Sequence, residues 1–363
     1  MKILFVGGGT AGHIMPALSI AERLAPSDTA YFILREGGRE NEPVYKAGYP
    51  AYHLKVFSLS GGILSRLKGI LALPSAKYNA KRIIKEIMPD AVFATGGYVS
   101  YPALSSARGL GIPTVIHEAN IKSGLVTRLF GKYADLLFLP EGTLDTGLAS
   151  LPQAHTSGTP VRRAFFELGY SEARRALGIS ENQRLIISQG GSLGADRLNC
   201  ACLSLMRGLC AKTKDIIHIH STGVRYFDKV KAEATDISAH AERCKILSYL
   251  ENMPLYLSAA DLIICRAGAS SIAELKVCGT PAILIPSPNV KDDHQSKNAL
   301  GLLKGSPALV IRESELTDEL LYDSALRLLN DKSLRKSLYK NTRAKKLMQD
   351  EARKILDEIA KLV

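Results

Sequence analysis

Four glycine-containing segments each follow a short apolar run, and they are the parts of this sequence best suited to holding phosphate. They occupy residues 7–12, 95–98, 190–194 and 266–269. Glycine lets backbone N–H groups approach a phosphate closely, and a following helix adds free N–H groups and a partial positive charge. One such segment fits a tight turn as well as a ligand site, but four favour a large polar ligand, or two ligands.

Two side chains beside these segments are suited to chemistry. His13 lies at the start of the helix expected after the first segment, where the positive helix end disfavours an imidazolium, so we expect a neutral imidazole that can accept a proton. Glu274 lies one to two turns into the helix that opens near Ala269, where a carboxylate can accept two hydrogen bonds from a ribose diol. His13 is equally suited to helix capping or ligand binding, and Glu274 to a surface ion pair.

Apolar runs alternate with amphipathic helical patterns along the chain, which predicts parallel sheets covered on both faces. Strand patterns occur at residues 2–6, 31–34, 91–94, 114–117, 136–139, 185–188, 216–220, 245–247, 262–265, 282–285 and 308–311. Helical patterns include residues 17–24, 195–209, 271–277 and 295–304. We predict an α/β protein of two doubly wound, Rossmann-like domains that face a cleft, residues 1–158 and 159–341, joined through a linker at 149–160.

Composition restricts the class of protein. The 363 residues are 46% hydrophobic and 23% charged, enough to form two aliphatic cores. The six cysteines lack CxxC spacing, so we expect reduced, buried thiols and neither a disulfide framework nor a zinc site. The net charge of +12 favours nucleic acid, an anionic membrane or phosphorylated substrates, and no nucleic-acid-binding motif is recognisable. No apolar run is long enough to span a bilayer.

Seven motifs occur along the chain: GGTAGH at 8–13, GGYVS at 96–100, HEAN at 117–120, TPVR at 159–162, GGSLGA at 190–195, CRAGA at 265–269 and DDHQSKNA at 292–299. In order and spacing they resemble those of the MurG family, the N-acetylglucosaminyltransferases of peptidoglycan synthesis. The resemblance covers nearly the whole chain. It implies the glycosyltransferase-B fold and inverting transfer of GlcNAc from UDP-GlcNAc to the MurNAc 4-hydroxyl of undecaprenyl-diphosphate-MurNAc-pentapeptide (lipid I), which gives lipid II.

The resemblance also implies an N-terminal acceptor and membrane-side domain, with the last helix, residues 342–363, packed back on it, and a C-terminal UDP-sugar domain. It assigns catalysis to His13 as general base and acceptor contacts to Gly12, His13, Gly96, Gly97 and Tyr98. Implied donor contacts are Thr10, Ala11, Gly12, Asn120, Arg162, Ser192, Leu250, Ala269, Ser270, Ser271, Ile272, Ala273, Glu274, Gln295 and Asn298. Asn120 is also suited to the acceptor. No metal and no cofactor are implied.

Two positions depart from the family pattern. Ala11 replaces the usual Gly and Leu193 the usual Gln, and both changes leave details of ligand recognition open. Three other functions stay open, and the two departures bear on the last of them. They are a UDP-sugar epimerase or glycolipid synthase with the same fold, a dinucleotide-dependent oxidoreductase built on the first segment with Glu36, and a non-catalytic sugar-nucleotide-binding subunit.

A lipid-linked acceptor requires a membrane-docking surface, and residues 55–88 are the best candidate. They carry seven basic residues and one acidic residue. We expect one helix that presents an apolar face, a break at Pro74, and a second helix with a basic stripe. Such a pattern is typical of helices that lie in the interface, although it also fits an ordinary core-facing helix. The docking residues are Ile63, Leu64, Leu67, Lys68, Lys77 and Lys81. The expected location is peripheral, on the cytoplasmic face of the inner membrane.

Overall fold

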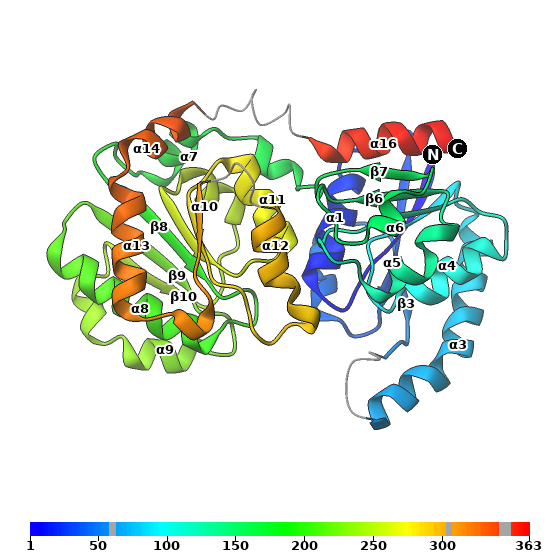
Figure 1. The fold of residues 1–363 in the computed structure, drawn as a ribbon, viewed down its shortest axis with the longest axis horizontal. Helices are drawn as coiled ribbons and strands as arrows, with labels where there is room; N and C mark the ends of the chain where they lie inside the picture. The colour runs from blue at the N-terminus through cyan, green and yellow to red at the C-terminus, as the bar shows by residue number, and fades with distance from the viewer. Residues whose placement is uncertain (58–62, 303–306, 341–349) are drawn as a thin grey trace. The chain divides into compact units, whose positions relative to one another are not determined.

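The computed structural model describes residues 1–57, 63–302, 307–340 and 350–363, and the chain divides into two compact units (Figure 1). The first unit comprises Met1–Arg163 and Asp350–Val363, and the second comprises Ala164–Gln349. Each unit contains one parallel sheet covered by helices. The predicted fold class of two parallel-sheet α/β domains is thereby confirmed.

The first unit has a seven-stranded sheet in the order β3-β2-β1-β4-β5-β6-β7. Its strands are β1 (Lys2–Val6), β2 (Thr29–Arg35), β3 (Ala51–Leu54), β4 (Ala91–Ala94), β5 (Thr114–His117), β6 (Leu136–Leu139) and β7 (Ala154–Thr156). Its helices include α1 (Ala11–Ala21), α2 (Glu42–Lys46), α3 (Ile63–Ile87), α4 (Ser100–Arg108), α5 (Leu125–Phe130), α6 (Thr146–Ala149) and α16 (Glu351–Leu362). The direction of winding reverses between β1 and β4, so the loops after these strands flank a switch point, where doubly wound sheets bind ligands.

The second unit has a six-stranded sheet in the order β10-β9-β8-β11-β12-β13. Its strands are β8 (Arg184–Gln189), β9 (Ile216–Ser221), β10 (Cys244–Leu247), β11 (Leu262–Cys265), β12 (Ala282–Leu284) and β13 (Ala308–Val310). Its helices include α7 (Tyr170–Leu177), α8 (Asp196–Lys212), α9 (Phe227–Glu233), α10 (Met253–Ala259), α11 (Ala269–Cys278), α12 (His294–Leu302), α13 (Asp318–Asn330) and α14 (Lys332–Tyr339). Here the switch point lies between β8 and β11.

Helix α16 completes the core of the first unit although it lies at the end of the sequence (Figure 1). Its side chains Ala352, Ile355, Leu356 and Ile359 are buried in the same cluster as Phe5 and Phe32. The Phe5 and Phe32 rings stack with centroids 5.2 Å apart, which supplies aromatic bulk in a chain that lacks tryptophan.

The two chain segments at the boundary of the first unit, near Arg163 and at Asp350, are hydrogen-bonded to residues at the end of α1. Arg23 donates from Nε to Asp350 Oδ2 at 2.8 Å and from Nη2 to the Val161 carbonyl at 3.3 Å. Glu22 accepts a hydrogen bond of 2.8 Å from the Arg163 N–H. The Arg23 and Asp350 side chains are only 4% and 2% exposed, so this is a buried ion pair with additional hydrogen bonds. Residues 159–163 therefore pack with the first unit, a few residues beyond the expected boundary.

Two local expectations were wrong. The expected linker at 149–160 begins at the last residue of α6 and contains the edge strand β7, because three residues with little apolar character suffice for a strand at a sheet edge. Pro74 does not break the chain, since α3 runs through it for 25 residues. Proline removes the hydrogen bond to the carbonyl of residue 70, and Ile70 is 55% exposed, so water can solvate that carbonyl.

The expectation of reduced, buried cysteines holds only in part. Cys202, Cys265 and Cys278 are free and buried, and burial raises the pKa of the Cys202 and Cys265 thiols to about 12. Cys200 is free but exposed, and Cys244 is disulfide-bonded, which the spacing of the cysteines does not indicate.

Candidate active site

The first two glycine loops interlock at the switch point of the first sheet. A Cβ on Gly97 would lie 2.1 Å from the Gly8 carbonyl oxygen, and a Cβ on Gly7 would lie 2.5 Å from Thr95 Oγ1. Gly97 also has a φ of +78°, which side chains rarely adopt. The Gly9 position faces the Tyr98 ring, with a Cβ there 3.0 Å from Cε1. The structure thus brings the predicted residues Gly96, Gly97 and Tyr98 against the first loop.

His13 lies in the first turn of α1 and is oriented by the second loop. Its Nδ1 lies 2.8 Å from the Thr95 carbonyl oxygen. Since a carbonyl can only accept, Nδ1 carries a proton, and in the neutral ring Nε2 holds the lone pair. No residue that the structure describes bonds Nε2. The Thr95 hydroxyl in turn donates to the His13 carbonyl, so Thr95 hydrogen-bonds both the ring and the backbone of His13.

The rest of the first loop is open to solvent. Thr10 is the extended N-cap residue of α1, and both Thr10 and Gly12 are exposed. A Cβ on Gly12 would meet only the Thr10 hydroxyl, at 3.6 Å, so packing does not require glycine there. Ala11 opens the helix, and its side chain lies outside the part that the structure describes.

Sequence reasoning missed a carboxylate that binds this loop from another part of the chain. Glu40 Oε1 accepts from the Gly9 N–H at 2.9 Å and from Arg35 Nε at 3.0 Å, and Arg35 Nη2 donates to Oε2 at 3.2 Å. Glu36, the acidic residue noted from the sequence, is exposed. A dinucleotide-binding loop donates its N–H groups to a pyrophosphate, whereas the Gly9 N–H already donates to the Glu40 carboxylate.

Glu118 is a second carboxylate that the sequence motif contains but whose role its position did not reveal. It is 5% exposed and accepts from the Asn120 N–H and Nδ2, each at 3.0 Å, and from the Gly124 N–H and Thr127 Oγ1, each at 2.8 Å. Four donors satisfy its charge. Glu118 therefore fixes the loop after β5 and with it the half-buried Asn120.

Arg162 lies close to the end of the first unit with a donor unsatisfied. Its Nε is buried, and no described residue accepts a hydrogen bond from it. An unpaired buried donor on a guanidinium is costly, and an anionic ligand is a natural partner.

In the second unit, too, glycines let two loops pack closely against each other. A Cβ on Gly194, where φ is +81°, would lie 2.0 Å from the Thr222 carbonyl oxygen, and one on Gly223 would lie 2.1 Å from the Gly194 nitrogen. The loop after β8 is thus held against the loop after β9. Ser192 and Leu193 are exposed on it. The N-cap residue of α8 is Ala195, which has no capping side chain, so Ser192 is not the cap.

Helix α11 follows the neighbouring strand β11 and carries six of the fifteen predicted donor residues, positions 269–274. Its N-cap is Gly268, again without a capping side chain. Ala269 and Ile272 are buried, whereas Ser270, Ser271, Ala273 and Glu274 are half-buried, and Ser270 Oγ has no hydrogen-bond partner among the described residues. Arg266, just before the helix, pairs with Glu313 at 2.5 Å and donates to the Ile285 carbonyl at 3.1 Å, so its role here is to hold the loop.

The remaining predicted donor residues differ in accessibility. Gln295 on α12 is half-buried, and its Oε1 accepts from the Ser287 N–H at 2.8 Å, so its NH₂ group is the end available to a ligand. Asn298, one turn later, is 0% exposed, and Leu250 is 4% exposed. Of these two amides among the predicted donor contacts, only Gln295 reaches the surface.

A buried polar cluster lies one residue before the end of β8. Ser188 Oγ lies 2.7 Å from His218 Nε2 and 2.8 Å from His220 Nδ1, and all three residues are buried. One hydroxyl can donate to one ring and accept from the other, so two neutral rings satisfy it. Burial lowers the pKa of His220 to about 4 and holds that of His218, which also faces His220, well below its usual range.

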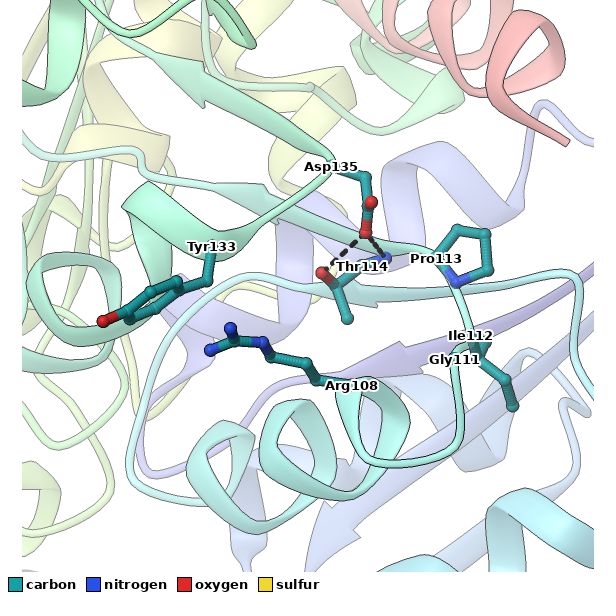
Figure 2. Close-up of a pocket in the computed structure, with 7 residues that line it drawn as sticks. All are labelled: Arg108, Gly111, Ile112, Pro113, Thr114, Tyr133 and Asp135. Carbon is teal, nitrogen blue, oxygen red and sulfur yellow. Dashed lines mark hydrogen bonds between the residues drawn. The ribbon is translucent and has the colours of Figure 1, made fainter.

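A surface hollow of the first unit lies away from the glycine loops. It has a volume of about 220 Å³ and lies where β5 and β6 begin, opposite the glycine loops (Figure 2). Arg108 lies 4.0 Å above the Tyr133 ring, and Asp135 accepts from the Thr114 N–H at 2.7 Å. No predicted site residue lines it, and ligands of such sheets bind at the opposite, carboxyl edge. Within the described residues, no three His, Cys, Asp or Glu side chains converge as a metal site.

Comparison with known proteins gives the family. Residues 3–138 match the glycosyltransferase family 28 N-terminal domain, and residues 185–359 match the glycosyltransferase family 28 C-terminal domain. A protein of Ruminiclostridium cellulolyticum is 35% identical over 367 residues, covering 100% of both chains. It is named UDP-N-acetylglucosamine–N-acetylmuramyl-(pentapeptide) pyrophosphoryl-undecaprenol N-acetylglucosamine transferase. A relative of the same name from Alkaliphilus metalliredigens is 36% identical, covering 92% of this chain and 91% of the relative.

Solved structures agree with this result. MurG of Acinetobacter baumannii has a TM-score of 0.74 at 27% identity and covers 99% of each chain. The UDP-GlcNAc 2-epimerase of Neisseria meningitidis has a TM-score of 0.67 at 13% identity, a likeness of fold alone. With full-length relatives above 30% identity and two glycosyltransferase-B-like domains, the chain belongs to the MurG family of N-acetylglucosaminyltransferases.

Proposed function

We propose that this chain transfers GlcNAc from UDP-GlcNAc to the MurNAc 4-hydroxyl of the undecaprenyl-diphosphate-linked acceptor, with His13 as the general base. As a family member the chain is a UDP-GlcNAc-dependent N-acetylglucosaminyltransferase of peptidoglycan synthesis, and the epimerase alternative is not favoured. The observation that carries the assignment of the base is the ring of His13, which the Thr95 carbonyl orients through Nδ1 while no described residue bonds Nε2.

The chemistry follows from that geometry. As the acceptor oxygen attacks the anomeric carbon from the face opposite UDP, its proton passes to His13 Nε2 and the bond to the UDP oxygen breaks. The products are the β-linked disaccharide and UDP. While that bond breaks, negative charge grows on the leaving diphosphate. Helix N-termini and a guanidinium stabilise this charge and so lower the barrier. We assign this role to the amino ends of α8 and α11 and to Arg162, whose Nε lacks a described partner.

Donor recognition is assigned to the second unit. We propose that Glu274 accepts hydrogen bonds from the ribose diol, that Ser192 and Ser270 bind the diphosphate, and that the NH₂ group of Gln295 binds a GlcNAc hydroxyl. The unsatisfied Ser270 hydroxyl supports this assignment. The acceptor is assigned to Gly12, His13 and the loop of Gly96, Gly97 and Tyr98 in the first unit.

The test is to supply UDP-GlcNAc with a short-chain lipid I analogue and to measure UDP together with the disaccharide product. We expect both in equal amounts, with none formed when the acceptor is omitted. Isomerised UDP-sugar without transfer would instead reveal an epimerase, and donor binding without UDP release would reveal a non-catalytic subunit. NAD(P) binding would support the oxidoreductase, which the occupied Gly9 N–H disfavours.

We further propose that α3 docks the chain peripherally on the anionic cytoplasmic face of the inner membrane. One face of α3 is core, with Ala76, Ala80, Ile83, Ile84 and Ile87 buried. Away from it, Leu71 is 78% exposed and Ile70 55% exposed, and Lys77 and Lys81 are exposed without a carboxylate partner among the described residues. The side chains of Ile63, Leu64, Leu67 and Lys68 lie outside the described residues. No described helix has the length and apolarity to cross a bilayer.

Docking is tested by co-sedimentation with liposomes that contain anionic lipid. Wild type should bind at low salt, and binding should weaken with salt because each Lys or Arg near the surface contributes about 1 kcal/mol. Ile70→Ser with Leu71→Ser should reduce binding. Leu300→Ser is the matched control, since Leu300 on α12 is 73% exposed but belongs to the second unit. If wild type ignores such liposomes, or the control weakens binding equally, the α3 surface is not the docking site.

A further inference from the structure

The Glu40 carboxylate is bound as a ligand would be, although it belongs to the chain itself. Its two oxygens receive three hydrogen bonds, one from the Gly9 N–H and two from Arg35. The Glu40 side chain is 10% exposed and that of Arg35 is 30% exposed. Burial favours the neutral acid, but the hydrogen bonds from Arg35 and from the Gly9 N–H outweigh it and lower the pKa of Glu40. This ion pair is mostly buried and also binds the Gly9 N–H, so it is held more firmly than a solvated surface pair.

Gly9 needs such an anchor. Glycine can adopt many backbone conformations, and the φ of +91° at Gly9 is only one of them. Contacts from outside the loop must therefore fix its conformation. The Tyr98 ring bounds Gly9 on one side, and the Glu40 carboxylate binds its N–H. The charged and titratable groups that face this carboxylate are Arg35 and Tyr98. Four residues beyond Gly9 stands His13, whose N–H donates to the Thr10 carbonyl at 3.1 Å.

We propose that Glu40 is a positioning residue for the transfer reaction: it binds the Gly9 N–H as an internal anion and so fixes the loop that leads into His13. This inference rests on the proposed role of His13. Because the carboxylate already occupies the Gly9 N–H, this donor is not used for a substrate phosphate. Arg35 neutralises the carboxylate and holds it in a two-point contact, so a neutral pair and not a net charge lies beside the acceptor loop.

Kinetics with Glu40→Ala and Glu40→Gln test the proposal. Loss of the anchor should lower kcat about ten- to a hundred-fold, as small misplacements of catalytic groups do, and leave the KM for UDP-GlcNAc within about two-fold. Glu40→Gln should be intermediate, since its amide oxygen can accept from Gly9 while its NH₂ group opposes the Arg35 donors. Glu42→Gln is the matched control, because Glu42 is 67% exposed and, within the part of the chain that the structure describes, pairs only with Lys46 on the same helix. Kinetics unchanged in both Glu40 variants would overturn the proposal and leave a merely structural ion pair.

A second readout does not depend on transferase activity. In amide NMR spectra, the Gly9 N–H of wild type should resonate downfield and move upfield on acidification, with a midpoint below that of an ordinary glutamate. The Glu42→Gln variant should behave like wild type, whereas the signal should already be shifted in Glu40→Gln and no longer titrate. A Gly9 amide that ignores both pH and the Glu40 substitution overturns the anchor, even in a protein that folds and transfers GlcNAc. A wild type with no transferase activity but a normal Gly9 titration would refute the proposed function and leave the anchor standing.

Discussion

The buried Ser188–His218–His220 cluster should make the second unit sensitive to acid, and one substitution should reduce that sensitivity. His220 has a pKa of about 4 in the folded chain against an ordinary value of 6.5. Between these values the unfolded chain binds a proton that the folded chain refuses, so stability rises with pH across this window. The contribution is fully present above about pH 6.5 and is lost as pH falls towards 4.

The magnitude follows from linkage. The shift corresponds to about 3 kcal/mol in full, and between about pH 7 and pH 5 the loss for His220 alone is about 2 kcal/mol. His218 acts in the same direction, since its pKa is also lowered by burial. A protonated ring here would be an uncompensated buried charge, because the only described hydrogen-bond partner of both rings is the Ser188 hydroxyl.

The assay is urea unfolding of wild type and His220→Gln at both pH values, with hydrogen exchange of the β8 and β9 amides to assign the loss to the second unit. The variant cannot titrate, so its stability should change less with pH by about 2 kcal/mol, whatever its stability at neutral pH. His240→Gln, a part-exposed position in the same unit, should keep the wild-type dependence. Identical pH slopes in wild type and His220→Gln would refute this explanation.

Three further outcomes are expected. Glu274→Ala should raise the KM for UDP-GlcNAc about 30-fold, equivalent to about 2 kcal/mol for hydrogen bonds to a charged group, and an unchanged KM would reject the ribose contact. His13→Gln should depress kcat while donor affinity, measured by calorimetry with UDP, stays near that of wild type, and near-normal turnover would retire His13 as the base. Asp261→Ala should cost about 3–5 kcal/mol of unfolding free energy, because the carboxylate accepts from Arg174 at 2.8 Å, Tyr170 at 2.6 Å and the Leu185 N–H at 2.7 Å. A denaturant midpoint equal to that of wild type would contradict it.

The central strands could be predicted from the sequence because buried parallel strands are continuous apolar runs. The expected strand at residues 2–6 coincides with β1, and those at 91–94 and 262–265 coincide with β4 and β11. The edge strands β3 and β7 were missed, since an edge strand needs apolar residues on few positions. The helix break expected at Pro74 was wrong because a helix tolerates proline where the freed carbonyl meets solvent.

The candidate site could be predicted only where its residues have a chemical signature of their own. Glycine loops and a histidine at a helix start are recognisable in sequence, and the structure brings Gly96, Gly97 and Tyr98 next to the loop of His13. Glu40 stands among other charged residues in the segment 39–42, so nothing in its neighbours distinguishes it. Its role arises from a contact between residues 31 positions apart. The burial of Asn298 could not be predicted either, since helical spacing indicates which face a side chain shares but not how deeply it lies.

The buried α16 side chains have a consequence for the order in which the chain folds during synthesis. The second unit is one continuous stretch, Ala164–Gln349, so the ribosome delivers all of it before Asp350 emerges. The first unit must wait for Ala352, Ile355, Leu356 and Ile359 to close the core around Phe5 and Phe32, and for Asp350 to neutralise the buried Arg23. Until then the nascent first unit exposes an apolar face and lacks the Asp350 carboxylate that binds Arg23. The part of this protein that is made first is therefore the part that is finished last.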